Sequence, residues 1–171
     1  AAPQRRLAAG AGQGDIGAMT FGPQVEIVRA HLADAVAKGA TVLAGGERTE
    51  RAGLWFPPTV VVPDSHDDPL MQEETFGPIV AVLPFDDEAD AIRLANDSPY
   101  GLSGSIYTND LGRAMRVSRG IESGNLSVNS HSSVRYWTPF GGFKMSGIGR
   151  EHGPEALEYY LETKGVVVAT P

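Results

Sequence analysis

The pattern of apolar and polar positions predicts that the regular structure begins with a helix. Apolar side chains recur at intervals of three and four residues, which places them along one face of a helix. This face is formed by Val25, Val28, Leu32 and Val36. Gly39 follows at the position where a left-handed residue would end the helix.

Beyond this helix, short apolar runs alternate with amphipathic stretches. The apolar runs predict strands at residues 41–44, 59–62, 79–83, 103–107 and 126–129. The amphipathic stretches predict a helix at 86–95 and another that begins after an N-cap at Asn109 or Asp110. Because single helices separate most of these strands, right-handed crossovers and a largely parallel sheet are expected.

The last part of the chain departs from this rhythm. Residues 130–149 combine aromatic residues, a proline and several glycines without a sustained period, which predicts a loop. Pro154 suits the start of a helix, and the apolar run 166–168 predicts a strand that needs a partner edge. The expected fold class is therefore α/β, an open and largely parallel twisted sheet with flanking helices and a C-terminal strand.

Composition and charge narrow the classes of partner. With 171 residues, 42% of them hydrophobic, the chain can build one globular core. A net charge of −7 leaves no basic surplus for phosphates, so neither nucleic acid nor an anionic membrane is an expected partner. Residues 1–17 contain no continuous apolar run, so no signal peptide or membrane span is expected, and the predicted location is the cytoplasm.

The absence of cysteine excludes several kinds of chemistry for this stretch of sequence. The chain contains no cysteine, so it can form no disulfide, no thiolate metal site and no cysteine nucleophile. Asp64, His66, Asp67 and Asp68 lie close together but lack a recognised ligand spacing, which favours a solvated acidic turn over a metal site. No metal is expected.

Two other patterns are judged weak. The glycines of GQGDIG, residues 12–17, have the spacing of a dinucleotide fingerprint, but no strand precedes them and no helix follows directly, which favours a connector. Residues 130–133 place His131 among serines, but catalytic triads assemble from distant segments, so a hydrolase is not favoured.

Two further segments carry more information. In QEETFGP, residues 72–78, carboxylates precede an aromatic residue at the start of a buried strand, where they could chelate the hydroxyls of a ribose or be ordinary surface acids. In PFGGFKMSGIG, residues 139–149, dense glycine either lets the backbone approach a ligand or makes a loose loop. For the first segment, physical reasoning alone favours ordinary surface acids, whereas for the second, composition does not choose between the two interpretations.

Four motifs in order resemble the aldehyde dehydrogenase superfamily. They are EETFGPIV at 73–80, NDSPYGL at 96–102, GNLSVN at 124–129 and PFGGFKMSGIGR at 139–150. The resemblance runs from about residue 21 to residue 168. It implies a flexible N-terminal segment, residues 1–20, followed by an incomplete catalytic-domain-like region, residues 21–171, whose terminal strand serves oligomerisation.

The resemblance also implies roles for individual residues. Glu74 would hold the hydroxyls of the nicotinamide ribose, and Phe76 would pack beside the nicotinamide. The cofactor would be NAD or NADP, of which this chain holds only part of the site. Residues expected at the aldehyde pocket are Phe140, Trp137, Tyr136 and His131.

The enzymes of this family use a cysteine thiolate to attack the aldehyde and a glutamate to activate water, and neither falls within the motifs matched here. No catalytic residue is therefore assigned. The expected function is a portion of an oxidoreductase that oxidises an aldehyde to a carboxylic acid with NAD(P)+ and that needs a complementary segment. The alternative is a non-catalytic module that assembles with itself, as a homo-oligomer, or with complete subunits.

Overall fold

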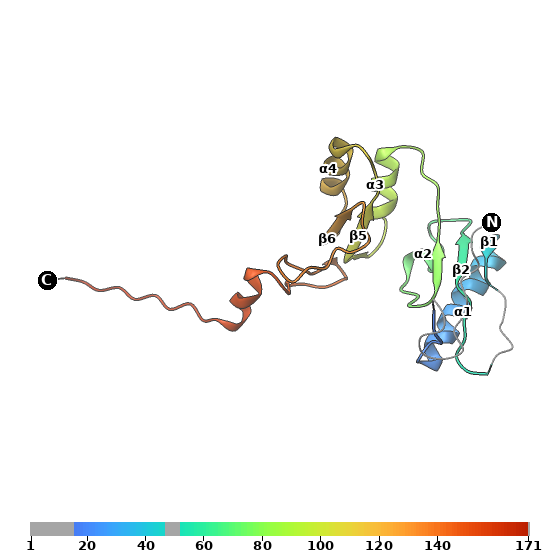
Figure 1. Cartoon of the computed structure of the whole chain (residues 1–171), viewed down its shortest axis with the longest axis horizontal. Coiled ribbons are helices and arrows are strands. Elements are labelled where there is room, and N and C mark those ends of the chain that lie inside the picture. Colours follow the sequence, from blue (N-terminus) through green and yellow to red (C-terminus); the bar gives the residue numbers. More distant parts are fainter. Residues whose placement is uncertain (1–15, 47–51, 171) are drawn as a thin grey trace. The chain divides into compact units, whose positions relative to one another are not determined.

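The structure is a computed structural model that describes residues 16–46 and 52–170. It divides the chain into two compact units, unit 1 (Ala1–Pro84) and unit 2 (Phe85–Pro171), shown in Figure 1. Residues 1–15 of the expected N-terminal segment lie outside the described residues, as do Gly12 and Gly14 of the glycine motif. No helix in the described ranges is long and apolar enough to cross a membrane.

Unit 1 packs one long helix on a small mixed sheet. Helix α1 spans Gly22–Ala37 and precedes β1 (Thr41–Ala44), which pairs antiparallel with β2 (Thr59–Val62). Strand β2 pairs parallel with β3 (Ile79–Ala81), and the short helix α2 (Pro69–Gln72) lies between them in sequence. The expected helix and the first two expected strands are confirmed, and the third strand is shorter than predicted.

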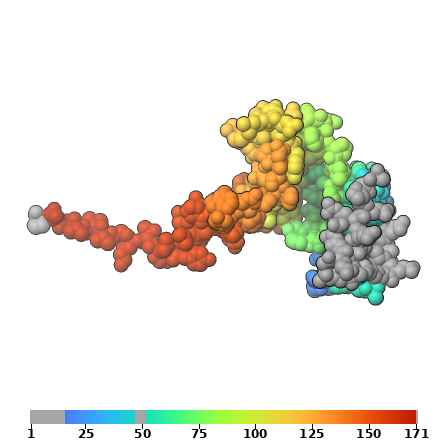
Figure 2. All heavy atoms as spheres, viewed as in Figure 1, coloured from blue at the N-terminus to red at the C-terminus, as the bar shows by residue number. Residues whose placement is uncertain are grey.

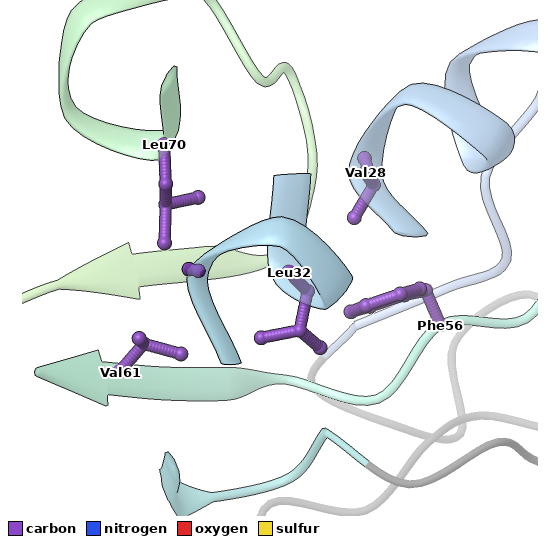
Figure 3. Packing of buried hydrophobic residues seen from close by; sticks show 6 residues of the cluster. Val28, Leu32, Phe56, Val61 and Leu70 are labelled. Carbon is purple, nitrogen blue, oxygen red and sulfur yellow. The ribbon is translucent and has the colours of Figure 1, made fainter. Parts of the chain in front are cut away.

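The core of unit 1 lies between α1 and this sheet. Figure 3 shows it as a cluster of side chains from α1, β2, α2 and the segment before β2. Its buried members are Val28, Leu32, Ala35, Phe56, Val61 and Leu70. Burying a side chain of valine or leucine size contributes about 1.5–3 kcal/mol, so this cluster is the main source of stability in the unit.

The apolar face predicted for this helix is confirmed at three of its four positions. Val25, Val28 and Leu32 are buried, whereas Val36 is 47% exposed. His31 occupies a buried position on α1 instead and is only 9% exposed. A buried imidazole on an otherwise apolar face requires hydrogen-bond partners.

Unit 2 contains a parallel strand pair joined by a helix. Strand β5 (Ser103–Ile106) pairs parallel with β6 (Asn125–Val128), and α4 (Leu111–Gly120) connects them. Asp110 is the N-cap of α4, and its carboxylate accepts a hydrogen bond of 3.0 Å from the backbone N–H of Arg113. This bond holds the pKa of Asp110 below its usual value.

The rest of unit 2 comprises a helix and a second strand pair. Helix α3 spans Glu88–Asn96, and β4 (Tyr100–Gly101) pairs antiparallel with β7 (Phe143–Lys144). The expected strands and helices of this region are confirmed with small differences at their ends. Strands β4 and β7 were not anticipated, and β7 lies within the segment expected to be a loop.

The α/β class is confirmed, but the strands do not join into one sheet. The described residues form a mixed three-stranded sheet and two separate strand pairs, of which only β2–β3 and β5–β6 are parallel. The helix expected at Pro154 is a 3-10 helix, η1 (Pro154–Tyr160). Local periodicity predicts the longer elements, whereas the joining of strands depends on partners that it does not specify.

The predicted strand 166–168 does not pair within the described chain. Residues 161–170 have no regular secondary structure and are exposed throughout. Figure 2 shows this segment as a strip one chain wide. An apolar extended segment forms a strand only when it pairs with an edge, and within the described residues this segment pairs with none.

Candidate functional site

A short loop of unit 1 carries the two residues expected at the cofactor. It runs from Glu73 to Pro78, between α2 and β3. Glu74 is exposed, and Phe76 is 74% exposed. Phe76 has a backbone φ of 42°, in the left-handed region that a bulky side chain rarely adopts. The loop thus presents a carboxylate and an aromatic ring outward, and its backbone is strained at Phe76.

Helix α1 holds this loop through two polar side chains. Gln24 Nε2 donates a hydrogen bond to the carbonyl oxygen of Thr75, 2.6 Å away. His31 Nδ1 lies 3.0 Å from Thr75 Oγ1, and His31 Nε2 lies 3.2 Å from Glu73 Oε2. These bonds satisfy the buried imidazole and fix the loop on the side of Phe76 that leads from α2.

Glycine fixes the other side of Phe76. A Cβ atom at Gly77 would overlap the side chain of Val28, so only glycine lets the loop lie this close to α1. The carbonyl oxygen of Pro78 then accepts a hydrogen bond of 2.9 Å from Thr59 N, where the β2–β3 pairing begins. The loop is therefore anchored to the helix and to the sheet.

The chemistry of this loop suits the nicotinamide end of a dinucleotide. A carboxylate can accept hydrogen bonds from both neighbouring hydroxyls of a ribose. An exposed aromatic ring offers a flat apolar surface to a heterocycle. Glu74 and Phe76 supply both groups at alternate positions of one loop.

In unit 2, Phe140 lines a hollow of about 630 Å³. Its backbone pairs with that of Glu151 through two hydrogen bonds of 2.7 Å each. Its ring meets the His152 ring edge to face, with centroids 6.3 Å apart. The hollow is also lined by Leu102, Ile148, Arg150, Tyr159 and Tyr160. It combines apolar and aromatic surface with a few polar groups, as small-molecule pockets do.

The glycine-rich segment 139–150 is fastened to the earlier motifs by Lys144. Its ammonium group donates hydrogen bonds to the carbonyl oxygens of Asn96 and Ser98, at 2.6 and 3.1 Å. It also lies 2.8 Å from a carboxylate oxygen of Glu122. One side chain thus ties three separate parts of the unit together.

Asn125 provides a second fastening. Its side-chain amide donates hydrogen bonds to the carbonyl oxygens of Gly141, at 2.8 Å, and Leu102, at 3.2 Å. Next to it, a Cβ atom at Gly124 would overlap the same Gly141 carbonyl. The motifs that begin at residues 96, 124 and 139 therefore meet in space, and sequence reasoning had assigned no role to Lys144 or Asn125.

The other expected pocket residues lie in the loop before Phe140. Tyr136 and Trp137 pack edge to face, with centroids 4.5 Å apart and planes at 85°. Both are exposed, as is His131. Among the described residues that line the hollow, Phe140 is present and these three are not.

The acidic turn differs from its expected form at one residue. Asp68 is only 3% exposed, with one carboxylate oxygen 3.6 Å from Lys38 Nζ. Within the described residues, its other oxygen is buried without a hydrogen-bond partner. The prediction of a solvated turn is therefore wrong for Asp68, because the residue before α2 is covered by the helix packing. No group of three or more His, Cys, Asp or Glu side chains in the described ranges could hold a metal ion.

Comparison with known proteins gives consistent results. The model of the aldehyde dehydrogenase family matches residues 4–166, beginning earlier than the motifs suggested. The chain is 48% identical over 128 residues to an aldehyde dehydrogenase of Aspergillus niger, covering 75% of this chain and 26% of that protein. It is 40% identical over 158 residues to the NADP(+) succinate-semialdehyde dehydrogenase of Escherichia coli, covering 90% of this chain and 33% of that protein.

A solved structure agrees with these relatives. The crystal structure of Mycobacterium tuberculosis aldehyde dehydrogenase complexed with NAD+ superposes with a TM-score of 0.87 at 37% identity, covering 93% of this chain and 33% of the other. The chain spans a third or less of the length of the proteins named here.

Proposed function

The chain belongs to the aldehyde dehydrogenase family, and we propose that it supplies part of an enzyme that oxidises an aldehyde to a carboxylic acid with NAD(P)+. Within residues 21–171, unit 1 would hold the nicotinamide end of the cofactor and unit 2 would form one wall of the aldehyde pocket. The observation that carries this proposal is the outward presentation of Glu74 and Phe76 on a loop anchored to α1. A cytoplasmic location stays a prediction of the sequence.

Glu74 and Phe76 would divide the contact with the cofactor between them. The Glu74 carboxylate would accept hydrogen bonds from the ribose hydroxyls, and the Phe76 ring would pack beside the nicotinamide. When bound, the nicotinamide supplies the hydride acceptor. Only this end of the cofactor is assigned residues here, so the site is a partial one.

In unit 2, Phe140 would line the aldehyde pocket, with His131, Tyr136 and Trp137 as further lining residues. The 630 Å³ hollow supports the assignment of Phe140, which lines it, whereas His131, Tyr136 and Trp137 do not line it and are proposed from the family resemblance alone. The chain contains no cysteine, so we propose that the attacking thiol and the glutamate that activates water come from other sequence.

Binding of NAD+ to the 171-residue chain tests the proposal. Saturation-transfer NMR should show transfer to the nicotinamide and ribose protons, with weak affinity. Glu74→Gln should weaken binding about tenfold, because it removes a charged acceptor. The control Glu162→Gln, which removes an exposed carboxylate of unit 2, should leave binding unchanged. Transfer that survives Glu74→Gln at full strength would exclude the ribose role.

A second candidate role, assembly, is favoured by the apolar surface of the C-terminal segment. Val166 is 74%, Val167 97% and Val168 80% exposed, and such runs are normally covered by another chain. Large apolar side chains exposed elsewhere in unit 2 include Tyr107, Leu111, Met115, Met145 and Ile148. We propose that the chain pairs with itself or with complementary aldehyde dehydrogenase sequence through this segment.

Deletion of residues 165–171 tests the assembly role. Light scattering should show an oligomer for the full chain and a lower mass for the deletion variant, because the apolar strand is lost. Hydrogen exchange of residues 59–129 should remain unchanged. Deleting only residues 170–171 serves as the control and should preserve the oligomer. A full-length chain that is monomeric, with the same mass as the deletion variant, would rule the role out.

A further inference from the structure

His31 is a buried polar residue that the proposed chemistry does not use. It lies on the face of α1 that packs into the core of unit 1, and both of its ring nitrogens have partners. Both partners, Glu73 and Thr75, belong to the loop that carries Glu74 and Phe76. Among the described residues of unit 1, the hydrogen bonds of this ring go only to this loop.

The contacts between α1 and the loop follow a regular pattern on both sides. Three helix residues spaced by four and then three positions lie along one face, and they meet alternate loop residues. The helix residues are Gln24, Val28 and His31, and the loop residues are Glu73, Thr75 and Gly77. The residues between them, Glu74 and Phe76, have exposed side chains, with Phe76 74% exposed, so they face solvent rather than the helix.

The hydrogen-bonding roles at His31 fix this arrangement. The Glu73 carboxylate can only accept, so in the neutral ring Nε2 carries the proton and donates to it. Nδ1 then accepts from the Thr75 hydroxyl. The Thr75 carbonyl is occupied by Gln24, so Thr75 is held at both its side chain and its backbone.

This hold is needed because the next residue is strained. Phe76 has a φ of 42°, and a bulky residue keeps such a conformation only where its surroundings enforce it. Thr75 on one side is fixed by His31 and Gln24, and Gly77 on the other is packed against Val28. Without these contacts, we expect the segment to relax and Glu74 and Phe76 to lose their fixed, exposed positions.

We propose that His31 is a positioning residue that sets the loop so that Glu74 and Phe76 face the cofactor. The role rests on the proposed function, because a cofactor must bind at these two residues for their direction to matter. His31 itself contacts no reacting atom in this proposal.

Hydrogen exchange of the 171-residue chain without cofactor tests the positioning directly. His31→Phe keeps a ring in the core but removes both hydrogen bonds, and should raise the exchange of amides 74–77 about tenfold. His31→Gln, which retains a donor close to the Nε2 position, should give a smaller increase. Arg29→Gln, which breaks the exposed Glu26–Arg29 pair on the same helix, should leave the loop unchanged.

A second measurement separates positioning from a general loss of stability. NAD+ affinity, measured by NMR, should fall several-fold in His31→Phe and recover in part in His31→Gln. Thr75→Val removes the loop partner without altering the core and should reproduce the exchange pattern of His31→Phe if the latter folds poorly. Combined with His31→Phe, it should add little, because both variants break the same bond.

The outcomes distinguish the two proposals. Unchanged exchange of 74–77 in both His31→Phe and Thr75→Val would overturn the positioning role, as would a rise spread evenly over α1, β2 and β3. A loosened loop in a chain whose wild type does not bind NAD+ would refute the proposed cofactor site while showing that His31 organises the loop.

Discussion

Different interactions stabilise the interior of unit 1 and the interior of unit 2. Unit 1 has a cluster of buried apolar side chains between α1 and the sheet. In the described part of unit 2, the only buried apolar side chains are Ile106 and Ala114. Polar side chains that reach backbone carbonyls, chiefly Lys144 and Asn125, connect its segments instead.

This difference determines how each candidate site should respond to substitution. Apolar burial is non-directional, so unit 1 can lose a polar contact of the cofactor loop and still keep its core. Hydrogen bonds to fixed carbonyls are directional, so unit 2 should lose the geometry of its glycine-rich segment whenever one of its fastenings fails. We therefore expect local effects in unit 1 and cooperative effects in unit 2.

The largest effect is expected at Gly124. An alanine Cβ there would overlap the Gly141 carbonyl oxygen. The position of a Cβ is fixed by its own backbone and the carbonyl is itself backbone, so neither can rotate away. Gly124→Ala should destabilise unit 2 by about 2–3 kcal/mol. The chain has two tryptophans, Trp55 in unit 1 and Trp137 in unit 2, so urea unfolding of Trp55→Phe and Trp137→Phe backgrounds reads the units separately.

The control for this prediction is Gly165→Ala, since the added Cβ would meet nothing within 4 Å. The Trp137 signal should shift to lower urea in Gly124→Ala and stay in place in the control, while the Trp55 signal moves in neither. An unchanged Trp137 transition in Gly124→Ala would show that the segment around Gly141 can shift aside at little cost. It would contradict the idea that unit 2 depends on directional contacts of fixed geometry.

A smaller effect is expected at Lys144. Lys144→Met keeps most of the side chain's length but removes the donor to the Asn96 and Ser98 carbonyls and the pair with Glu122. Its side chain is 25% exposed, so water compensates in part, and a loss of about 1–2 kcal/mol in unit 2 is expected. Lys164→Met, in the exposed C-terminal segment, is the matched control. Equal unfolding midpoints for the two variants would remove Lys144 from the fastening network.

The two units also differ in how far sequence could predict them. Elements set by local signals were predicted in both units. In unit 1 this holds for the buried helix positions Val25, Val28 and Leu32, and in unit 2 for the N-cap of α4, expected at Asn109 or Asp110 and found at Asp110. The burial of His31 was not predicted, because it depends on partners more than forty residues away in sequence. The separation of the described strands into three sheets was not predicted either, because strand pairing also depends on contacts between distant parts of the sequence.

The sequence nominated residues for the candidate site but not the residues that support them. The family motifs suggested Glu74, Phe76 and Phe140, whose roles stay predictions, and physical reasoning alone favoured Glu74 as an ordinary surface acid. Lys144 was visible only as one lysine in a glycine-rich segment. Its bonds go to backbone carbonyls, which every residue possesses, so no residue pattern at the receiving end reveals them.

The smallest expected effect concerns the link between α3 and α4, which is polar but exposed. The Arg116 guanidinium binds both carboxylate oxygens of Glu88, at 2.8 and 2.9 Å, and this pairing holds the pKa of Glu88 below its ordinary value of 4.5. A lowered folded-state pKa means that the unfolded state binds a proton more readily. The contribution of Glu88 is therefore complete above pH 4.5 and is lost as the pH falls through the lower, folded-state pKa.

Because an exposed pair contributes little, the difference in urea midpoint between wild type and Glu88→Gln at pH 7 should be smaller than that for Lys144→Met. That difference should vanish at low pH, where both side chains are neutral, and shrink in high salt. Comparing the two proteins at each pH cancels the titration of all other carboxylates. A difference that persists unchanged at low pH would mean that Glu88 acts through packing. This part of unit 2 would then be stabilised by burial, as unit 1 is, and not by polar contacts.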